Sequence, residues 1–304
     1  MWRTVIVNNG EKLLIRNNWL IVYSNNNEHQ VPIEDIYAVV IDNHSTLFSV
    51  SVMTTLAQAG VHILFCDEKH IPVAASFPLN THYKPLSVIN RQFNLTEEFK
   101  NDIWSRIVKA KIINQYKCLH YCGIEKSKLE ELLKISDAIT SGDKNNREAV
   151  AAKKYFKMLF GCTFKRSDND ITNAALNYGY SVVRSSVCKT LCVYGFNCVL
   201  GVHHINQSNP FNLADDIMEP LRPLVDLLVD ENCDNLFETL TKENRRTLVN
   251  VVNLPVLINE KKMRVRYAID VYVRSLVTAI NENNPDLLLI PQIIPVDEFF
   301  EEDV

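Results

Sequence analysis

The residues best suited to chemistry lie in residues 201–226. Within its first nineteen positions this stretch combines an Asn-rich turn with two adjacent histidines and three acids: His203, His204, Asp215, Asp216 and Glu219. The turn favours a helix that begins near Leu213 with Asn212 as its N-cap, and on that helix Glu219 shares a face with both aspartates. Like charges at this spacing repel unless a cation lies between them, so a divalent metal with a histidine ligand is one interpretation. The other is a solvated helix start, because acids in a first turn also stabilise the helix dipole.

Glu148 is the single acid in a basic segment, residues 144–166, whose seven cationic side chains are Lys144, Arg147, Lys153, Lys154, Lys157, Lys165 and Arg166. It can form an ion pair with a lysine of its own helix such as Lys153, which contributes little at an exposed surface. It can instead join a histidine and Glu219 around a divalent ion, a set of hard oxygen ligands and one imidazole that suits Mn²⁺ or Mg²⁺. Such an ion beside basic residues is typical of phosphodiester chemistry, because it polarises the phosphoryl oxygen and activates the attacking oxygen.

Four motifs occur in order along the chain: Asn146–Phe156 (NREAVAAKKYF), Leu176–Tyr180 (LNYGY), Gly201–His204 (GVHH) and Asp216–Asp226 (DIMEPLRPLVD). With these motifs the sequence resembles the CRISPR-associated adaptation integrases, and within them the branch found in type II systems. The resemblance covers essentially the whole chain, including residues 31–35 and 61–67. Any one motif alone would be weak support, whereas the four in order are specific.

The resemblance implies an N-terminal β domain and a helical catalytic domain whose metal ligands are Glu148, His204 and Glu219, with Mg²⁺ or Mn²⁺ as the cofactor. His203 lies beside the matched histidine, and because neighbouring side chains of an extended chain point to opposite faces, we expect at most one of the two to face the acids. The implied reaction inserts short foreign DNA, the spacer, into the CRISPR array, where a 3′-hydroxyl attacks a phosphodiester at a repeat boundary. Metal-dependent cleavage of branched or single-stranded DNA is similar chemistry with water as the nucleophile.

The resemblance also implies partners. The family forms homodimers that a small dimeric protein of the adaptation machinery bridges, and other CRISPR effector proteins are further candidates. For the DNA we expect contacts from five side chains of the helical domain: Arg106, Lys153, Tyr155, Lys157 and Arg166. Tyr155 has two interpretations, a ring that stacks on a base or a side chain of the core.

The patterns of apolar and turn-forming residues predict that an α+β, multidomain chain positions these residues. Short apolar runs separated by Asn- and Gly-rich turns indicate a β-rich domain over residues 1–80, suited to dimerisation or partner docking. Residues 81–90 are expected to be a linker, because Pro85 disfavours a helix there. Amphipathic patterns predict a helical catalytic domain over residues 91–290, followed by an acidic, flexible tail at 291–304.

Composition sets limits on the class of protein. The 304 residues are 47% hydrophobic and 22% charged, so the chain can bury a sizeable core, and no apolar run is long enough to cross a membrane. The N-terminus lacks the pattern of a secretory signal, so we expect a cytoplasmic protein whose eight cysteines are reduced core thiols rather than zinc ligands. The formal net charge of −4 argues against indiscriminate polyanion binding and predicts segregated basic and acidic patches. Two other functions stay open: a hydrolase of a small phosphorylated substrate and a non-catalytic nucleic-acid scaffold.

Overall fold

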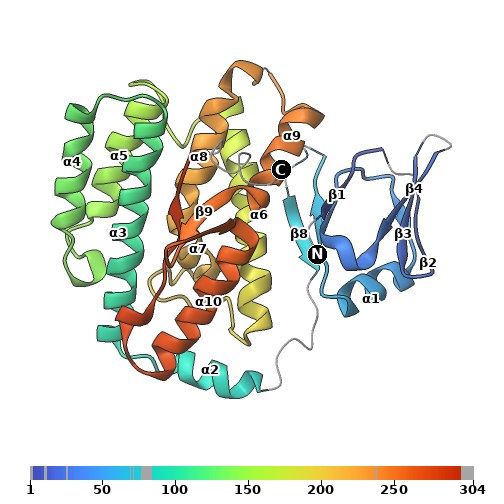
Figure 1. Cartoon of the computed structure of the whole chain (residues 1–304), viewed down its shortest axis with the longest axis horizontal. Coiled ribbons are helices and arrows are strands. Elements are labelled where there is room, and N and C mark those ends of the chain that lie inside the picture. Colours follow the sequence, from blue (N-terminus) through green and yellow to red (C-terminus); the bar gives the residue numbers. More distant parts are fainter. Residues whose placement is uncertain are drawn as a thin grey trace.

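The computed structural model describes residues 3–9, 12–24, 27–68, 70, 72–76, 84–236 and 238–295. A β-rich part at the N-terminus lies beside a larger part built mostly from helices (Figure 1). This arrangement confirms the α+β fold class predicted from the sequence. Within the described ranges, no helix is long and apolar enough to cross a membrane.

Two four-stranded sheets make up the N-terminal part. The first has the order β1–β5–β7–β8, and only β8 is antiparallel to its neighbour. Its strands are β1 (Arg3–Val7), β5 (Ile36–Ile41), β7 (His62–Cys66) and β8 (Pro72–Ser76). The second has the order β4–β3–β2–β6, with β2 (Lys12–Arg16), β3 (Trp19–Ser24), β4 (Asn27–Pro32) and β6 (Leu47–Phe48). Helix α1 (Val50–Gln58) buries Val52 and Leu56 in the core that these sheets share.

Strand β5 is buried on both faces, which explains why its sequence is an unbroken apolar run. One set of its side chains packs into the core shared with α1 and the second sheet: Ile36, Val39 and Ile41. The other set belongs to the large core of the helical part: Tyr37, Ala38 and Val40. The first sheet therefore joins the two parts, and a buried ion pair of 2.7 Å between Arg245 Nε and Asp42 Oδ2 connects them further.

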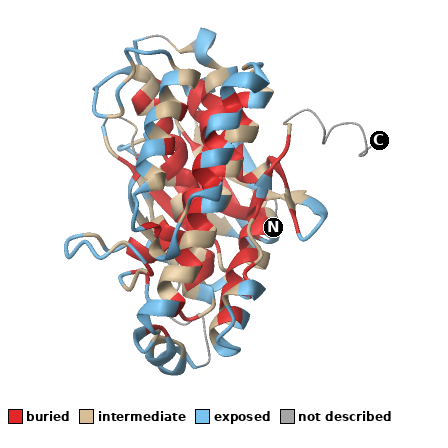
Figure 2. Ribbon diagram, turned by 90° about the vertical axis from the view of Figure 1, so that its left-hand side faces the viewer, coloured by how far each residue is buried: buried red, intermediate tan, exposed pale blue. Residues whose placement is uncertain are grey.

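Helix α6 is the central helix of the C-terminal part and is buried along most of its 23 residues. Buried residues run through the middle of the helical layers, while exposed residues gather toward their ends (Figure 2). The helices are α2 (Pro85–Phe93), α3 (Glu97–Tyr121), α4 (Lys126–Asp137), α5 (Arg147–Leu159), α6 (Ile171–Val193), α7 (Asn212–Met218), α8 (Arg222–Glu231), α9 (Lys242–Val249) and α10 (Val265–Asn281).

Two expectations about secondary structure are wrong. The linker expected at 81–90 contains the start of α2, because Pro85 occupies the first helical position, where no N–H donor is required. The region expected to be helical also contains a small antiparallel sheet of β10 (Lys261–Arg264), β9 (Pro255–Ile258) and β11 (Gln292–Ile293). Asn259 and Glu260 connect β9 to β10 with positive φ at both positions, a hairpin turn that an apolar pattern does not reveal.

The segment expected to be a flexible tail, residues 291–304, begins as ordered structure. Asn114 of α3 holds it: its Nδ2 donates to the Pro291 carbonyl at 3.0 Å, and its Oδ1 accepts from Ile293 N at 3.2 Å. The same amide donates to the Pro220 carbonyl at 2.7 Å, so the tail is fixed beside the turn that carries Glu219. Residues 296–304 lie outside the described residues, and their flexibility stays a prediction.

Candidate active site

A lysine of α3 joins the two acids that the sequence singled out. Lys111 Nζ lies 2.5 Å from Glu148 Oε1 and 2.5 Å from Glu219 Oε2, and Arg222 Nε donates to the other oxygen of Glu219 at 2.8 Å. Lys111 and Glu219 are both buried. Burial raises the pKa of Glu219, but Arg222 and Lys111 outweigh it and lower that pKa to about 2. The carboxylate is therefore ionised across the physiological pH range.

The start of α5 places Glu148 at this lysine. The buried carboxylate of Asp143 accepts hydrogen bonds from the backbone N–H of Arg147 at 2.8 Å and of Glu148 at 3.0 Å. Asp143 thereby satisfies two of the free amides of the first turn. The pairing of Glu148 with a lysine of its own helix is wrong, because Lys153 lies five residues away on another face and Lys111 supplies the cation.

The three acids of residues 215–219 do not share one face, as the sequence analysis expected. Helix α7 ends at Met218, and a 3₁₀ turn carries Glu219 away from the aspartates toward Lys111. Asp215 accepts instead from Asn209 Nδ2 at 2.7 Å, and Asp216 faces the histidines. Asn212 is the first residue of α7 rather than its N-cap, and its Nδ2 donates to the carbonyls of the preceding loop.

Asp216 organises the loop that carries the histidines. Its buried carboxylate accepts from three consecutive backbone N–H groups, those of Val202 at 2.7 Å, His203 at 3.0 Å and His204 at 3.1 Å. His204 Nδ1 lies 2.6 Å from the same carboxylate. A Cβ at Gly201 would lie 2.3 Å from the His204 carbonyl oxygen and 2.8 Å from Asp216, so only glycine fits at this position.

His203 and His204 both contact the ring of Trp104, and of the two imidazoles it is that of His204 that is hydrogen bonded to an acid, Asp216. The His203 ring stacks on Trp104 with centroids 4.0 Å apart, and the His204 ring meets it edge-on at 5.6 Å. The hydrogen bond to Asp216 raises the pKa of His204, and the charges of Asp216 and Glu219 add to this effect against partial burial. Burial lowers the pKa of His203. Asp216 holds Nδ1 of His204, which leaves Nε2 as the ring nitrogen available to another partner.

Two of the three expected metal ligands, Glu148 and Glu219, meet at Lys111, and the three are not gathered into one compact ligand set. Within the part of the chain that the structure describes, the only three His, Cys, Asp or Glu residues whose ligand atoms all lie within 4.8 Å of one another are Cys188, Cys192 and Cys198. Glu148 and Glu219 meet through the ammonium group of Lys111, and the charge of Glu219 acts on His204. The arrangement therefore places a cation between two carboxylates, beside a histidine oriented by Asp216.

The side chains expected to bind DNA have different environments. Tyr155 is fully buried, and its hydroxyl lies 2.8 Å from Asp226 Oδ2. The expectation that its ring stacks on a base is therefore wrong, and Tyr155 is a side chain of the core. Arg106 pairs with Asp286, while Arg166 donates to Asn173 and Asn177. Lys153 and Lys157 are exposed and line an open cavity of about 500 Å³ together with aromatic side chains and Arg166. These two lysines stay the predicted DNA contacts with free access to solvent.

Sequence reasoning missed Lys111, Asp143 and Trp104 as parts of the site. Trp104 and Lys111 are seven residues apart on α3, and this spacing places them on one face of the helix, where both are buried. A lysine among apolar residues was the available signal, because a buried cation requires an anionic partner. The structure shows that this partner is the pair of glutamates.

The comparisons with known proteins agree with this fold. The family model described as CRISPR associated protein Cas1 matches residues 4–239. The chain is 36% identical over 300 residues to the CRISPR-associated endonuclease Cas1 of Neisseria meningitidis serogroup C (strain 8013), and the match covers 98% of each chain.

Two solved structures share the fold. A casposase bound to integration product is 18% identical, with a TM-score of 0.75 and coverage of 93% of this chain and 91% of that one. A Cas6-RT-Cas1–Cas2 complex is 19% identical, with a TM-score of 0.73 and coverage of 96% of this chain and 36% of that one. With the family model matching most of the sequence and the Neisseria relative aligned along nearly its full length, the chain belongs to the Cas1 family of CRISPR associated proteins.

Proposed function

We propose that the chain is a metal-dependent DNA integrase of CRISPR adaptation, which joins the 3′-hydroxyl of a short foreign DNA to a repeat-boundary phosphodiester. The single observation that carries the proposal is the convergence of Glu148 and Glu219 on one buried cation, beside a histidine held by Asp216. Membership of the Cas1 family supports the CRISPR context, and the fold shared with a casposase bound to integration product supports the reaction class.

The donor set fits Mg²⁺ or Mn²⁺. Glu219 Oε2 is buried and lies 2.5 Å from the ammonium of Lys111, so this oxygen already faces a cation. Glu148, His204 and Glu219 would hold the metal through two carboxylates and one imidazole, as those ions prefer. When bound, it would supply Lewis-acid activation of the phosphoryl oxygen and of the attacking hydroxyl.

The residues of the chain have separate tasks in this reaction. Asp216 orients His204 by fixing Nδ1 and the loop backbone, so that Nε2 keeps one direction. Arg222 holds the Glu219 carboxylate ionised and in place. Lys153 and Lys157 would neutralise DNA phosphates at the surface and release their counterions.

The proposed partners follow from the family and from the solved assemblies. The chain would act as a homodimer in the cytoplasm on short duplex DNA and on CRISPR repeat DNA, with other CRISPR effector proteins as further candidates. A Cas2-like small dimer would bridge two dimers, in line with the Cas6-RT-Cas1–Cas2 complex whose Cas1 fold this chain shares.

A strand-transfer assay tests the proposal. Labelled short duplex with free 3′-hydroxyls would be incubated with supercoiled plasmid carrying a repeat array, in Mn²⁺ or in EDTA, with and without the small partner. We expect a joined product that requires the metal, is lost with 3′-dideoxy ends and is absent for Glu219→Ala. DNA binding by the variant, measured in parallel, should persist. A product that forms equally well in EDTA or with Glu219→Ala would contradict the proposal.

The same assay separates a second candidate function. The Neisseria relative is called an endonuclease, so metal-dependent hydrolysis of branched or single-stranded DNA at this site is the alternative. In that reaction water takes the place of the 3′-hydroxyl. Metal-dependent cleavage without any joined product, even in the presence of the small partner, would favour the endonuclease.

A further inference from the structure

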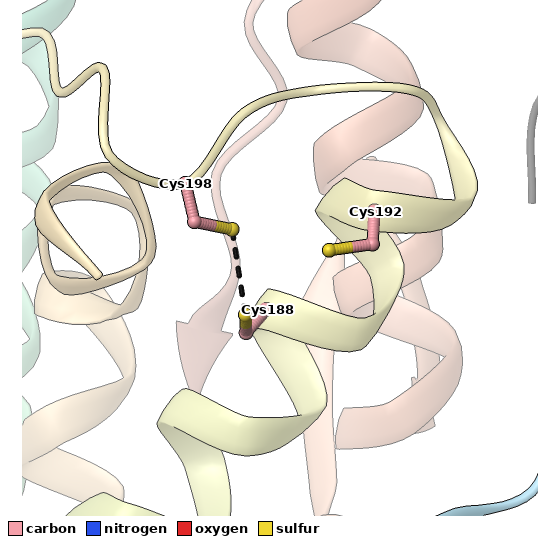
Figure 3. A group of neighbouring side chains, drawn as sticks. All are labelled: Cys188, Cys192 and Cys198. Carbon is pink, nitrogen blue, oxygen red and sulfur yellow. Dashed lines mark hydrogen bonds between the residues drawn. The ribbon is translucent and has the colours of Figure 1, made fainter. Parts of the chain in front are cut away.

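Three cysteines form a compact cluster at the C-terminal end of α6 and in the loop that follows it (Figure 3). Cys188 and Cys192 lie one helical turn apart, and Cys198 comes from the loop that follows the helix. The three Sγ atoms all lie within 4.8 Å of one another, and those of Cys188 and Cys198 are 3.4 Å apart. Cys188 and Cys198 are buried, whereas Cys192 is half-buried.

We propose that this cluster is a binding site for a thiophilic metal ion, Zn²⁺ or Cu⁺. Thiolates lie about 2.3 Å from zinc, so two ligands of a tetrahedral site are about 3.8 Å apart. The sulfur separations in the cluster, from 3.4 Å up to the 4.8 Å limit, bracket that value, and small side-chain rotations reach it. Soft thiolate ligands select Zn²⁺ and Cu⁺ over the hard ions Mg²⁺ and Mn²⁺. The ion is therefore distinct from the one proposed at Glu148 and Glu219.

The surroundings of the cluster suit a metal thiolate. Arg184, one turn before Cys188 on α6, lines the same small cavity as Cys188 and brings a positive charge to that side of the cluster. A cavity of about 50 Å³ borders Cys188, which is room for a water that completes a tetrahedral zinc site. A Cu⁺ ion would need no fourth ligand, because three thiolate sulfurs complete its coordination.

The position of Cys198 gives the ion a structural consequence. Its carbonyl accepts from Leu213 N at 2.9 Å, at the start of α7, and Gln92 holds the carbonyls of Asn197 and Leu200 on either side. Cys198 precedes Gly201 by three residues and thus lies at the base of the histidine loop. An ion shared with α6 would fasten this loop to the central helix. This consequence for His204 rests on the proposed function, whereas metal binding itself does not.

The test is a metal titration of the full chain in the absence of DNA. Reduced protein, stripped with a chelator, is titrated with Cd²⁺ as a spectroscopic probe, and thiolate-to-metal charge-transfer absorption is recorded. We expect about one Cd²⁺ per chain, and at least about tenfold weaker binding for Cys198→Ser and Cys192→Ser. The matched control is Cys233→Ser, an exposed cysteine outside the cluster, which should bind as the unaltered chain does.

Competition and thiol mapping complete the experiment. Displacement of Cd²⁺ by Zn²⁺ in one arm and by Cu⁺ in another identifies the preferred ion, and the metal content of freshly purified chain should agree. Unchanged Cd²⁺ binding in both cluster variants would overturn the proposal, as would a Cys188–Cys198 disulfide in protein purified under reductant. If Cys198→Ser does not fold, Cys192→Ser carries the test, because its side chain is only half-buried. All of these outcomes are independent of strand transfer.

Discussion

Two buried carboxylates seven residues apart, Glu219 and Asp226, have opposite environments. Glu219 faces two cations, Lys111 and Arg222, which lower its pKa to about 2 although burial opposes them. Asp226 faces the hydroxyls of Tyr155 and Tyr180, and burial raises its pKa to about 6 because hydroxyls compensate the charge less well than cations do. One acid is held by charge and the other by neutral hydrogen bonds.

Under the proposed function, this difference separates the carboxylate expected to bind the metal, Glu219, from one with a structural part, Asp226. A carboxylate paired with ammonium and guanidinium groups stays ionised, and one of its cations can be exchanged for a metal ion. A carboxylate locked between tyrosine hydroxyls joins α5, α6 and α8 and offers no exchangeable partner. Both acids lie in the same sequence motif, so residue type alone does not separate these roles.

The largest expected effect is on strand transfer. Glu219→Gln should lower the rate by about a thousandfold, because the neutral amide cannot serve as an anionic ligand at the developing phosphate charge. Asp226→Asn should stay within about tenfold of the unaltered chain, since Asp226 lies outside the proposed ligand set. The measurement is the rate of joined-product formation in Mn²⁺, with DNA affinity measured in parallel. Equal losses for the two variants would remove the distinction between the two acids.

The second effect is on stability and tests the part of Lys111, the cation that Glu148 and Glu219 share. Lys111→Met removes the ammonium between Glu148 and Glu219, so the free energy of unfolding should fall by about 3 kcal/mol, the typical cost of an uncompensated buried charge. Because the two carboxylates then lack their common cation, Mn²⁺ should restore part of the loss by binding in its place. Urea unfolding with and without Mn²⁺ measures both.

The control for this variant is Lys109→Met, because Lys109 lies on the same helix and pairs with Asp137 at an exposed position. It should change the free energy of unfolding by well under 1 kcal/mol. Failure of Mn²⁺ to stabilise Lys111→Met more than the control would show that the two carboxylates do not accept a metal together.

The features that the sequence predicts correctly depend on residues close together in the chain, whereas the wrong predictions involve partners far apart in the chain. The motifs predict Glu148, His204 and Glu219 as site residues, and apolar patterns predict the N-terminal sheets and long helices, because these signals are local. An ion pair of Glu148 with Lys153 was one of two interpretations and is wrong, since the lysine that contacts Glu148, Lys111, lies 37 residues away and only tertiary packing brings it near. Tyr155 was assigned to DNA for the same reason: its hydroxyl partner, Asp226, is 71 residues distant.

Backbone detail explains the other differences. The 3₁₀ turn at Glu219 breaks the helical spacing that would have put the acids on one face, and Pro220 within it gave an ambiguous signal. The hairpin at Asn259 and Glu260 depends on two positive φ angles, which side-chain periodicity does not encode. The sequence thus indicates which residues carry chemistry, while their mutual arrangement requires the fold.

The third effect is a pH dependence with opposite signs for the two acids. The pKa of Asp226 is raised from 3.8 to about 6, so its contribution to stability is fully present below pH 3.8 and is lost as pH rises through about 6. The pKa of Glu219 is lowered from 4.5 to about 2, so its contribution is present above pH 4.5 and is lost as pH falls toward 2. Asp226→Asn should therefore abolish a decline of about 2 kcal/mol between pH 4 and pH 7.

Urea unfolding of the unaltered chain and of Asp226→Asn at several pH values measures this difference. Glu219→Gln provides the opposite control, because it should flatten the profile below pH 4.5 and leave the decline above it. If the free energy of unfolding of Asp226→Asn still declines between pH 4 and pH 7, another group causes the decline. Asp226 would then not be the acid that titrates near pH 6.

The smallest effect lies at the surface, where neither buried acid takes part. Lys153→Ala and Lys157→Ala should each weaken DNA binding uniformly across sequences and reduce the salt dependence of the affinity by about one unit of slope. Neither should change the free energy of unfolding by more than about 0.5 kcal/mol, because both side chains are exposed. The matched control is Lys261→Ala, an exposed lysine of β10. If that variant changes the salt slope equally, the contact surface is not centred on α5, and the lysines flanking Glu148 have no special part in holding DNA at the site.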